Sequence, residues 1–359
     1  MVQITNRAVT FINNKSEPSI TSREINFETC YGAKEIVVKI HAAALNPIDV
    51  LVYHGAFPWL AGKQEKTFSR DYSGEVVKVG SNVKGFEVGD KIVGLFQHFW
   101  GAQGTLSNYL VLDPTVHCAV AKVQAVEDPK YSDYVVNAAY PLVFGTAYQA
   151  LTGYGQKLGP DSRILVIGAS TSVSNALIQI AKNHLKVGTV VGTCSKKSVD
   201  YNKALGFDHL VAYDEGNTVQ EVQKLVKNDF GNQKFDLIFD SVGSSEFFPQ
   251  ISEILKDKSE NSYYSSIVGD SKLNYGHVSL TSLLPNWETL RRWGPFRKYN
   301  YKYVLLRKDP QAMALAAQMI AEKKYKPPID SVYKFDDFAD AFERLYSNRA
   351  KGKVVIEVI

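Results

Sequence analysis

The chain has 359 residues, of which 45% are hydrophobic and 22% charged, so it is long enough for about two domains and a sizeable core without disulfide or metal support. Its 41 basic and 37 acidic residues leave a formal net charge of +4, an excess too small to indicate nucleic-acid binding. The longest apolar stretch, residues 135–151, is interrupted by Asn137, Pro141 and Gly145, which excludes a membrane span.

The three cysteines, Cys30, Cys118 and Cys194, are widely spaced and form no CxxC pair. Neither a disulfide framework nor a zinc lobe is therefore expected, and free thiols in a reducing compartment are the simpler interpretation. The first 14 residues lack the charged-then-apolar pattern of a signal peptide and predict a short strand. We expect a cytoplasmic protein.

The first third of the chain predicts β structure. Residues 36–40 (IVVKI) and 75–79 (EVVKV) are short β-branched runs typical of strands. Residues 79–94 contain four glycines at a spacing that suits tight turns between antiparallel strands. A barrel-like β domain is the simplest interpretation.

Beyond about residue 126, strands alternate with helical patterns. The apolar run at 164–167 predicts a strand buried on both faces, and an amphipathic helix follows it. Further strands are expected at 189–193, 210–212, 235–240 and 263–268. This alternation predicts a doubly wound parallel sheet. A last helix near 335–346 and a terminal strand at 353–358 complete the chain.

The strand at 164–167 runs directly into residues 168–174 (GASTSVS) and then into a helix. A helix N-terminus presents free N–H groups and positive partial charge, which favour a phosphate. Of the usual G-x-G-x-x-G pattern only Gly168 is present. Two interpretations stay open: Ser170, Thr171 and Ser172 donate hydrogen bonds to a phosphate, or they only cap an ordinary helix.

The end of the second strand, residues 193–197 (TCSKK), lacks the acidic residue that accepts a hydrogen bond from the ribose 2′-hydroxyl of NAD. Ser195, Lys196 and Lys197 instead suit the 2′-phosphate of NADPH through charge-assisted hydrogen bonds. Lysines that merely solvate the start of a helix are the alternative. The pattern favours NADPH.

Seven short motifs occur in order along the chain: NPID (46–49), RDYSGEV (70–76), VGDKIV (88–93), GTLSNYL (104–110), TAYQAL (146–151), DSVG (240–243) and KGKVV (351–355). Together they resemble the quinone oxidoreductase (zeta-crystallin-like) branch of the medium-chain dehydrogenase/reductase superfamily over nearly the whole chain. Within that branch, residues 168–174, 327–333 and 348–355 look like a fungal subfamily associated with lipid droplets and mitochondria.

The resemblance implies an α/β protein in which a Rossmann domain interrupts a GroES-like, β-rich catalytic domain. The catalytic domain would comprise residues 1–126 and 307–359, and the doubly wound NADPH-binding domain residues 127–306. The resemblance also implies a location on lipid droplets and in mitochondria, and a homodimer formed through Rossmann-domain strands.

No catalytic metal is expected. Zinc-dependent relatives carry a cysteine where Asn46 stands and a histidine–acid pair where Arg70 and Asp71 stand. A catalytic zinc needs three protein ligands of the His, Cys or carboxylate type, and Asn46 and Arg70 do not supply that set.

The implied reaction is hydride transfer from NADPH to a quinone or an α,β-unsaturated carbonyl compound, with hydrogen-bond donors stabilising the developing charge. By resemblance the substrate-side donors are Asn46 and Tyr53, although an aromatic residue in this position often serves packing alone. Nucleotide contacts are carried over by resemblance onto Thr146, Ser170, Thr171, Ser172, Val173, Ser195, Lys196, Lys197, Tyr213 and Gly243.

Residues 285–303 are rich in tryptophan, tyrosine, arginine and lysine. This composition fits a peripheral contact with an anionic lipid surface, but a dimer contact or a loop covering the active site is the simpler interpretation. Pro285, Gly294 and Pro295 argue against one long amphipathic helix. The missing glycines at 168–174 also leave open a non-catalytic Rossmann protein that binds a nucleotide weakly and acts as an interaction or membrane-associated factor.

Overall fold

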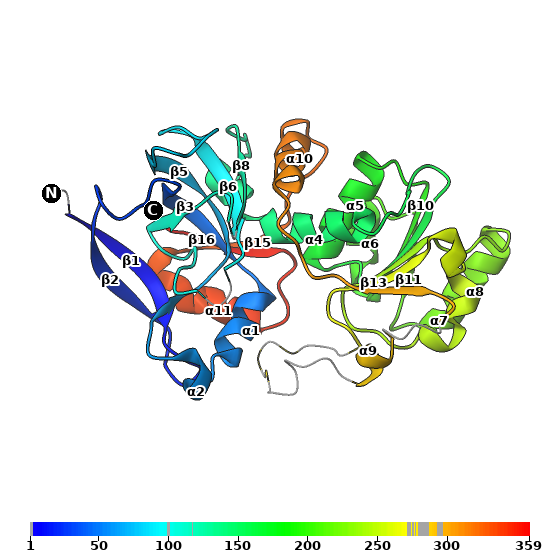
Figure 1. Cartoon of the computed structure of the whole chain (residues 1–359). Coiled ribbons are helices and arrows are strands. Elements are labelled where there is room, and N and C mark those ends of the chain that lie inside the picture. Colours follow the sequence, from blue (N-terminus) through cyan, green and yellow to red (C-terminus); the bar gives the residue numbers. More distant parts are fainter. Residues whose placement is uncertain are drawn as a thin grey trace. The chain divides into compact units, whose positions relative to one another are not determined.

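The computed structural model describes residues 3–98, 101–116, 118–270, 274, 276, 278, 287–292 and 297–359. The chain divides into two compact units (Figure 1). The first unit comprises Met1–Gly145, Asn274–Leu280 and Lys308–Ile359, and the second comprises Thr146–Leu273 and Thr281–Arg307. The chain thus leaves the first unit and returns to it.

The first unit contains a seven-stranded sheet, counted over the described residues. Its strands lie in the order β15 (Ile329–Lys334), β16 (Lys353–Glu357), β3 (Ile36–Leu45), β5 (Asp71–Val79), β6 (Lys91–Phe96) and β8 (Cys118–Lys122), and β7 (Tyr109–Leu112) also pairs with β3. The β15/β16 pair is parallel, whereas β16/β3, β3/β5, β5/β6 and β6/β8 are antiparallel. A second sheet joins β2 (Ser19–Asn26), β1 (Gln3–Phe11) and β4 (Lys66–Thr67). The predicted antiparallel β domain is confirmed.

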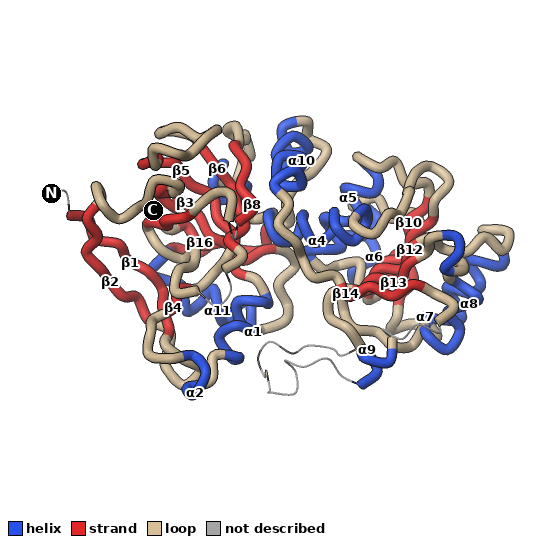
Figure 2. The backbone as a smooth tube through the Cα atoms, viewed as in Figure 1, coloured by secondary structure: helices blue, strands red, loops and turns tan. Residues whose placement is uncertain are grey.

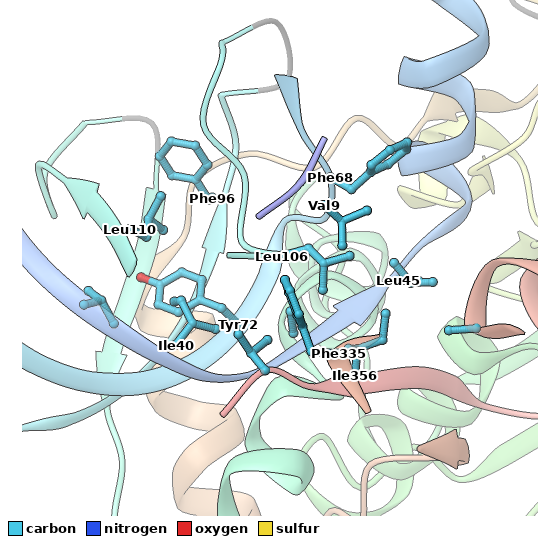
Figure 3. Packing of buried hydrophobic residues seen from close by; sticks show 14 of the residues in the cluster. Val9, Ile40, Leu45, Phe68, Tyr72, Phe96, Leu106, Leu110, Phe335 and Ile356 are labelled. Carbon is cyan, nitrogen blue, oxygen red and sulfur yellow. The ribbon is translucent and has the colours of Figure 1, made fainter. Parts of the chain in front are cut away.

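The core of the first unit forms because the apolar side chains of these strands pack against one another. Eight of the ten residues of β3 are buried, and its apolar side chains are covered on both of its faces. Figure 3 shows part of this core, to which strands and loops far apart in the sequence contribute Val9, Ile40, Leu45, Phe68, Tyr72, Phe96, Leu106, Leu110, Phe335 and Ile356. The C-terminal strand is therefore an integral part of a core built mainly by the first third of the chain.

The helices of the first unit are α1 (Pro47–Gly55), α2 (Pro58–Ala61), α3 (Asp133–Ala138), α10 (Pro310–Ala321) and α11 (Phe338–Tyr346), and α4 (Pro141–Thr152) crosses into the second unit. We expected the first domain boundary near residue 126, but the compact unit extends to Gly145. The reason is that Val135 and Ala138 of α3 pack against alanines of β3 and against Val355 of β16. In the described part of the chain, none of the helices has the length and hydropathy that a bilayer crossing requires.

The second unit contains a parallel sheet, which has six strands within the described ranges (Figure 2). The order is β11 (His209–Ala212), β10 (Thr189–Cys194), β9 (Arg163–Ile167), β12 (Leu237–Asp240), β13 (Tyr263–Ser266) and β14 (Asn300–Tyr303). Its helices include α5 (Ser172–Asn183), α6 (Val199–Ala204), α7 (Thr218–Lys224), α8 (Ile251–Ile254) and α9 (Trp287–Arg291). The chain order reverses between β9 and β12, so the predicted doubly wound sheet is confirmed, and ligands of such sheets bind at this reversal.

The sixth strand lies inside the aromatic and basic segment 285–303 and was not predicted. β14 pairs with β13, and the ring of Tyr301 stacks on that of Tyr264 with centroids 5.8 Å apart. Arg292 is likewise buried, in an ion pair with Asp270. These residues are structural, whereas residues 285, 286 and 293–296 lie outside the described residues. The expected contact of this segment with a lipid surface stays a prediction.

Close approach of β5 to β3 gives a test of the first unit. A Cβ atom on Gly74 would lie 2.3 Å from the carbonyl oxygen of Lys39, so Gly74→Ala must push two central strands apart. We expect the free energy of unfolding to fall by about 1–3 kcal/mol. At Gly216 a Cβ would meet nothing within 4 Å, so the control Gly216→Ala should change it by less than about 0.5 kcal/mol. Equal urea-unfolding curves for the two variants would contradict this packing.

Candidate functional site

The loop after β9 occupies the reversal point of the parallel sheet. Gly168 has φ +84°, and a Cβ there would lie 2.4 Å from Cγ1 of Val242, so only glycine fits. Thr193 of the neighbouring strand β10 holds the loop, because its hydroxyl accepts a hydrogen bond from the Gly168 amide at 3.2 Å and its carbonyl accepts one from Ala169 at 2.8 Å. The loop is fixed against both neighbours of β9.

The hydroxyl groups of Thr171, Ser174 and Ser241 lie within hydrogen-bond distance of one another, and we call them the hydroxyl triangle. The oxygen of Thr171 lies 3.0 Å from that of Ser174 and 3.0 Å from that of Ser241, and the two serine oxygens are 3.1 Å apart. Ser241 also donates to the carbonyl of Ile167 at 2.9 Å. Thr171 is the N-cap of α5 and accepts from the Ser174 amide at 3.2 Å. For Thr171 the structure therefore supports the capping interpretation.

Other donors of this loop stay available to a ligand. The amides of Ser172 and Val173 belong to the first turn of α5, where backbone N–H groups have no intrahelical acceptor. The hydroxyl of Ser170 accepts a hydrogen bond from the amide group of Asn202 at 2.8 Å, which leaves its own hydrogen free to donate. Ser170 and Ser172 are half-buried. Two amides and a hydroxyl at a helix N-terminus fit the pyrophosphate of a dinucleotide.

The predicted ribose-side residues lie together at the carboxyl ends of β10 and β11. The amide of Tyr213 donates to the carbonyl of Cys194 at 3.0 Å, which places the backbone of the exposed Tyr213 beside the start of the Ser195–Lys197 turn. Lys197 is exposed, and Ser195 is half-buried with its hydroxyl bonded to Ser198 at 3.2 Å. This arrangement fits an adenosine ribose phosphate.

Sequence reasoning missed two acidic residues at this corner. Asp214 accepts from the backbone amide of Lys196 at 2.8 Å, and Glu215 forms an ion pair of 2.8 Å with the Lys196 ammonium. The only sequence signal was their position directly after Tyr213. The Lys196–Glu215 ion pair is exposed and therefore holds Lys196 only weakly. Even so, Lys197 is the better placed of the two lysines to bind an anion.

Asp240, at the end of β12, organises the second loop of the reversal point. One carboxylate oxygen accepts from the amides of Val242 and Gly243, both at 2.9 Å. The other accepts from the Ser244 amide at 2.9 Å and from the Tyr264 hydroxyl at 3.0 Å. Gly243, predicted to contact the nucleotide, is therefore held beside the α5 loop. Thr146 is buried on α4, and no described hydrogen bond joins it to these loops.

The first unit holds a buried polar cluster around Asn46, the residue that precedes α1. The Asn46 backbone amide donates to Asp49 at 2.8 Å, and its side-chain Nδ2 donates to Asp71 at 2.9 Å. The ammonium of Lys353 donates to Oδ1 of Asn46 and, at 2.9 Å, to the same oxygen of Asp71. Burial raises the pKa of Asp49 to about 6, and Arg70 opposes that rise. Lys353 was not singled out in the sequence.

This cluster does not fit a catalytic zinc. Asn46 and Arg70 are not zinc ligands, and the position beside Asn46 and Asp71 is taken by the Lys353 ammonium. Across the ranges that the structure describes, no three His, Cys, Asp or Glu side chains gather as a metal site would require.

Tyr53 lies two turns along α1 from Asn46, and its surroundings are those of a packing residue. Its ring makes an edge contact with Phe11 at a centroid distance of 5.2 Å, and its hydroxyl donates to the carbonyl of Ser16 at 2.9 Å. Burial raises its pKa, and nearby Glu17 raises it further. The structure thus does not bring the Tyr53 hydroxyl to the Asn46 cluster.

Asp240 gives a pH-dependent test of the reversal point. Burial raises its pKa from 3.8 to about 6, although hydrogen bonds from the loop amides oppose the rise. Between these values the folded protein keeps a proton that the unfolded chain has lost, so this residue makes stability fall as pH rises, by roughly 3 kcal/mol in all. In urea unfolding, the free energy of unfolding of the wild type minus that of Asp240→Asn should therefore fall from pH 4 to pH 6. A difference independent of pH would contradict this.

The comparisons with known proteins agree with this architecture. A family model described as alcohol dehydrogenase GroES-like domain matches residues 32–124, and one described as zinc-binding dehydrogenase matches residues 205–356. The quinone oxidoreductase structure from Coxiella burnetii matches with a TM-score of 0.75 and 20% identity, covering 99% of this chain and 100% of that one. The CurK enoyl reductase structure matches with a TM-score of 0.72 and 20% identity, covering 98% and 99%. At such identity these structures show the fold.

A closer relative shows the family. Protein YIM1-2 of Lachancea thermotolerans is 60% identical over 356 residues, which cover 99% of this chain and 99% of the relative. The chain belongs to the medium-chain dehydrogenase/reductase superfamily of nicotinamide-dependent oxidoreductases and, within it, to the family of the fungal YIM1 proteins.

Proposed function

We propose that this protein is a zinc-independent, NADPH-dependent reductase of quinones or α,β-unsaturated carbonyl compounds. The observation that carries the proposal is the loop at the β9/β12 reversal, where the first-turn amides of Ser172 and Val173 have no intrahelical acceptor and so suit a pyrophosphate. When bound there, NADPH supplies the hydride. Val242 and Gly243, held by Asp240, line the same edge of the sheet.

The choice of a conjugated acceptor follows from the polar cluster around Asn46. Without a metal, a carbonyl must be polarised by hydrogen bonds and by charges of the protein itself. A quinone or an enone spreads the negative charge that develops on hydride addition, so it needs less polarisation than an isolated carbonyl. The structural neighbours named as a quinone oxidoreductase and an enoyl reductase support both substrate classes.

Turnover tests the proposal directly. Purified protein is incubated with NADPH and either 1,2-naphthoquinone or an enal, and oxidation is followed at the nicotinamide absorbance. We expect turnover with at least one acceptor, slower turnover with NADH, and no loss of rate after dialysis against a chelator. A rate that disappears with the chelator and returns with zinc would overturn the zinc-free chemistry.

The ribose-side lysines give a sharper prediction for cofactor choice. Lys197→Ala should weaken NADPH binding roughly tenfold, through loss of one charge-assisted contact, and leave NADH binding unchanged. Glu215→Gln should strengthen NADPH binding, because it releases the Lys196 ammonium from its ion pair. The matched control Glu221→Gln frees Lys224 on α7 and should have no effect. Fluorescence titration measures all three; identical affinities in every variant would refute NADPH preference.

The hydroxyl triangle favours a second candidate function, a non-catalytic nucleotide-binding protein. Thr171, Ser174 and Ser241 engage one another, so the loop offers fewer hydroxyl donors to a phosphate than its sequence suggests. The two functions separate in the turnover experiment. Binding of NADPH without oxidation by any acceptor would favour the second candidate.

A further inference from the structure

Lys353 is a buried cation whose position is fixed by its own strand. Its side chain is only 3% exposed, and its backbone amide donates to the carbonyl of Pro328 at 2.7 Å. The preceding Gly352 has φ +150°, and a Cβ there would lie 2.8 Å from the backbone nitrogen of Asp330. The start of β16 therefore packs tightly against β15, and this fixes the position of the Lys353 ammonium.

At that point the ammonium determines the orientation of the Asn46 side-chain amide. An ammonium only donates hydrogen bonds and a carboxylate only accepts them. Because Asn46 contacts both Lys353 and Asp71, its oxygen must face the ammonium and its nitrogen the carboxylate, as observed. Asp71 is itself held from the other side, since its second oxygen accepts from the Leu142 amide at 2.9 Å.

One N–H of Asn46 is left poorly satisfied by this arrangement. The amide nitrogen has two hydrogens, of which one is bound by Asp71 at 2.9 Å. The second has only the carbonyl of Ala44, at 3.4 Å, which is longer than an ordinary N–H···O bond. Asn46 is only 1% exposed, so an incoming carbonyl oxygen takes this donor by displacing the long contact with Ala44. The nearby ammonium also polarises the amide and strengthens what it donates.

We propose that Lys353 is a positioning residue of the reduction: it fixes Asn46 so that one amide N–H is presented to the acceptor oxygen, and it strengthens that donor as negative charge develops. The inference rests on the proposed function and deepens it. It assigns to Lys353 the part of the polarisation that zinc supplies in other members of the superfamily, exerted through Asn46.

A double-mutant cycle tests whether Lys353 acts through Asn46. We compare Asn46→Ala, Lys353→Met and the double variant, measuring kcat and KM for 1,2-naphthoquinone and the Kd of NADPH. Each single variant should lower kcat by roughly 10- to 100-fold. The double variant should be no slower than Asn46→Ala alone, because the ammonium has then lost its target. NADPH binding should be unchanged.

Lys66→Met is the matched control. Lys66 is also a buried lysine of the first unit, but its ammonium donates to the backbone carbonyls of Ala61 at 2.6 Å and Gln64 at 3.0 Å, away from Asn46. This variant should keep the wild-type kcat even if it lowers stability. Because Lys353→Met leaves the Asp71 carboxylate without its cation, the neutral pair Asp71→Asn with Lys353→Gln provides a second test. It should fold, as judged by urea unfolding, and lower kcat as Asn46→Ala does.

The outcomes separate this inference from the function beneath it. If the wild type turns over but the two single losses of kcat multiply in the double variant, only the role of Lys353 is overturned. The same conclusion holds if the wild type turns over and the neutral pair keeps the wild-type kcat. Absence of turnover in the wild type, with every acceptor, would overturn the proposed function and this inference with it.

Discussion

The candidate cofactor site depends on the contact between the loops that follow β9 and β12. Dinucleotide-binding loops commonly use glycines to bring these loops and the helix together. Here Gly168 alone keeps that role, because a Cβ would collide with Val242. The hydroxyl triangle of Thr171, Ser174 and Ser241 joins the helix to the second loop in place of the other glycines. Side-chain hydroxyls thus join these elements by hydrogen bonds, and the first-turn amides of α5 have no intrahelical acceptor.

The first unit contains a second set of fixed polar contacts. The ammonium of Lys353 donates to both Asn46 and the Asp71 carboxylate, and Asn46 donates to the same carboxylate. Burial makes such a pair costly unless its hydrogen bonds are complete, and Asp71 is bonded through both of its oxygens. The cluster is therefore rigid, and its charges are fixed in direction.

Local patterns predicted much of this fold, because they report on local structure. The apolar run at 164–167 and the capped helix after it form β9 and α5 as expected. β14 was missed, because Tyr301 belongs to an aromatic and basic run whose composition suggested a surface segment, while its ring in fact stacks on Tyr264. Lys353 was missed for a different reason: it lies 307 residues from Asn46, and no local pattern reports such a contact. Tyr53 was proposed as a donor from its place after the first strands, but an aromatic side chain fills a core as readily as it donates a proton.

The central claim is that the α5 loop binds NADPH through the amides of Ser172 and Val173. A crystal structure of the protein grown with NADPH tests it most directly. The account predicts pyrophosphate oxygens within about 3 Å of both amides, with the 2′-phosphate beside Ser195 and Lys197. Crystals that contain the dinucleotide elsewhere, or none at saturating NADPH, would contradict it.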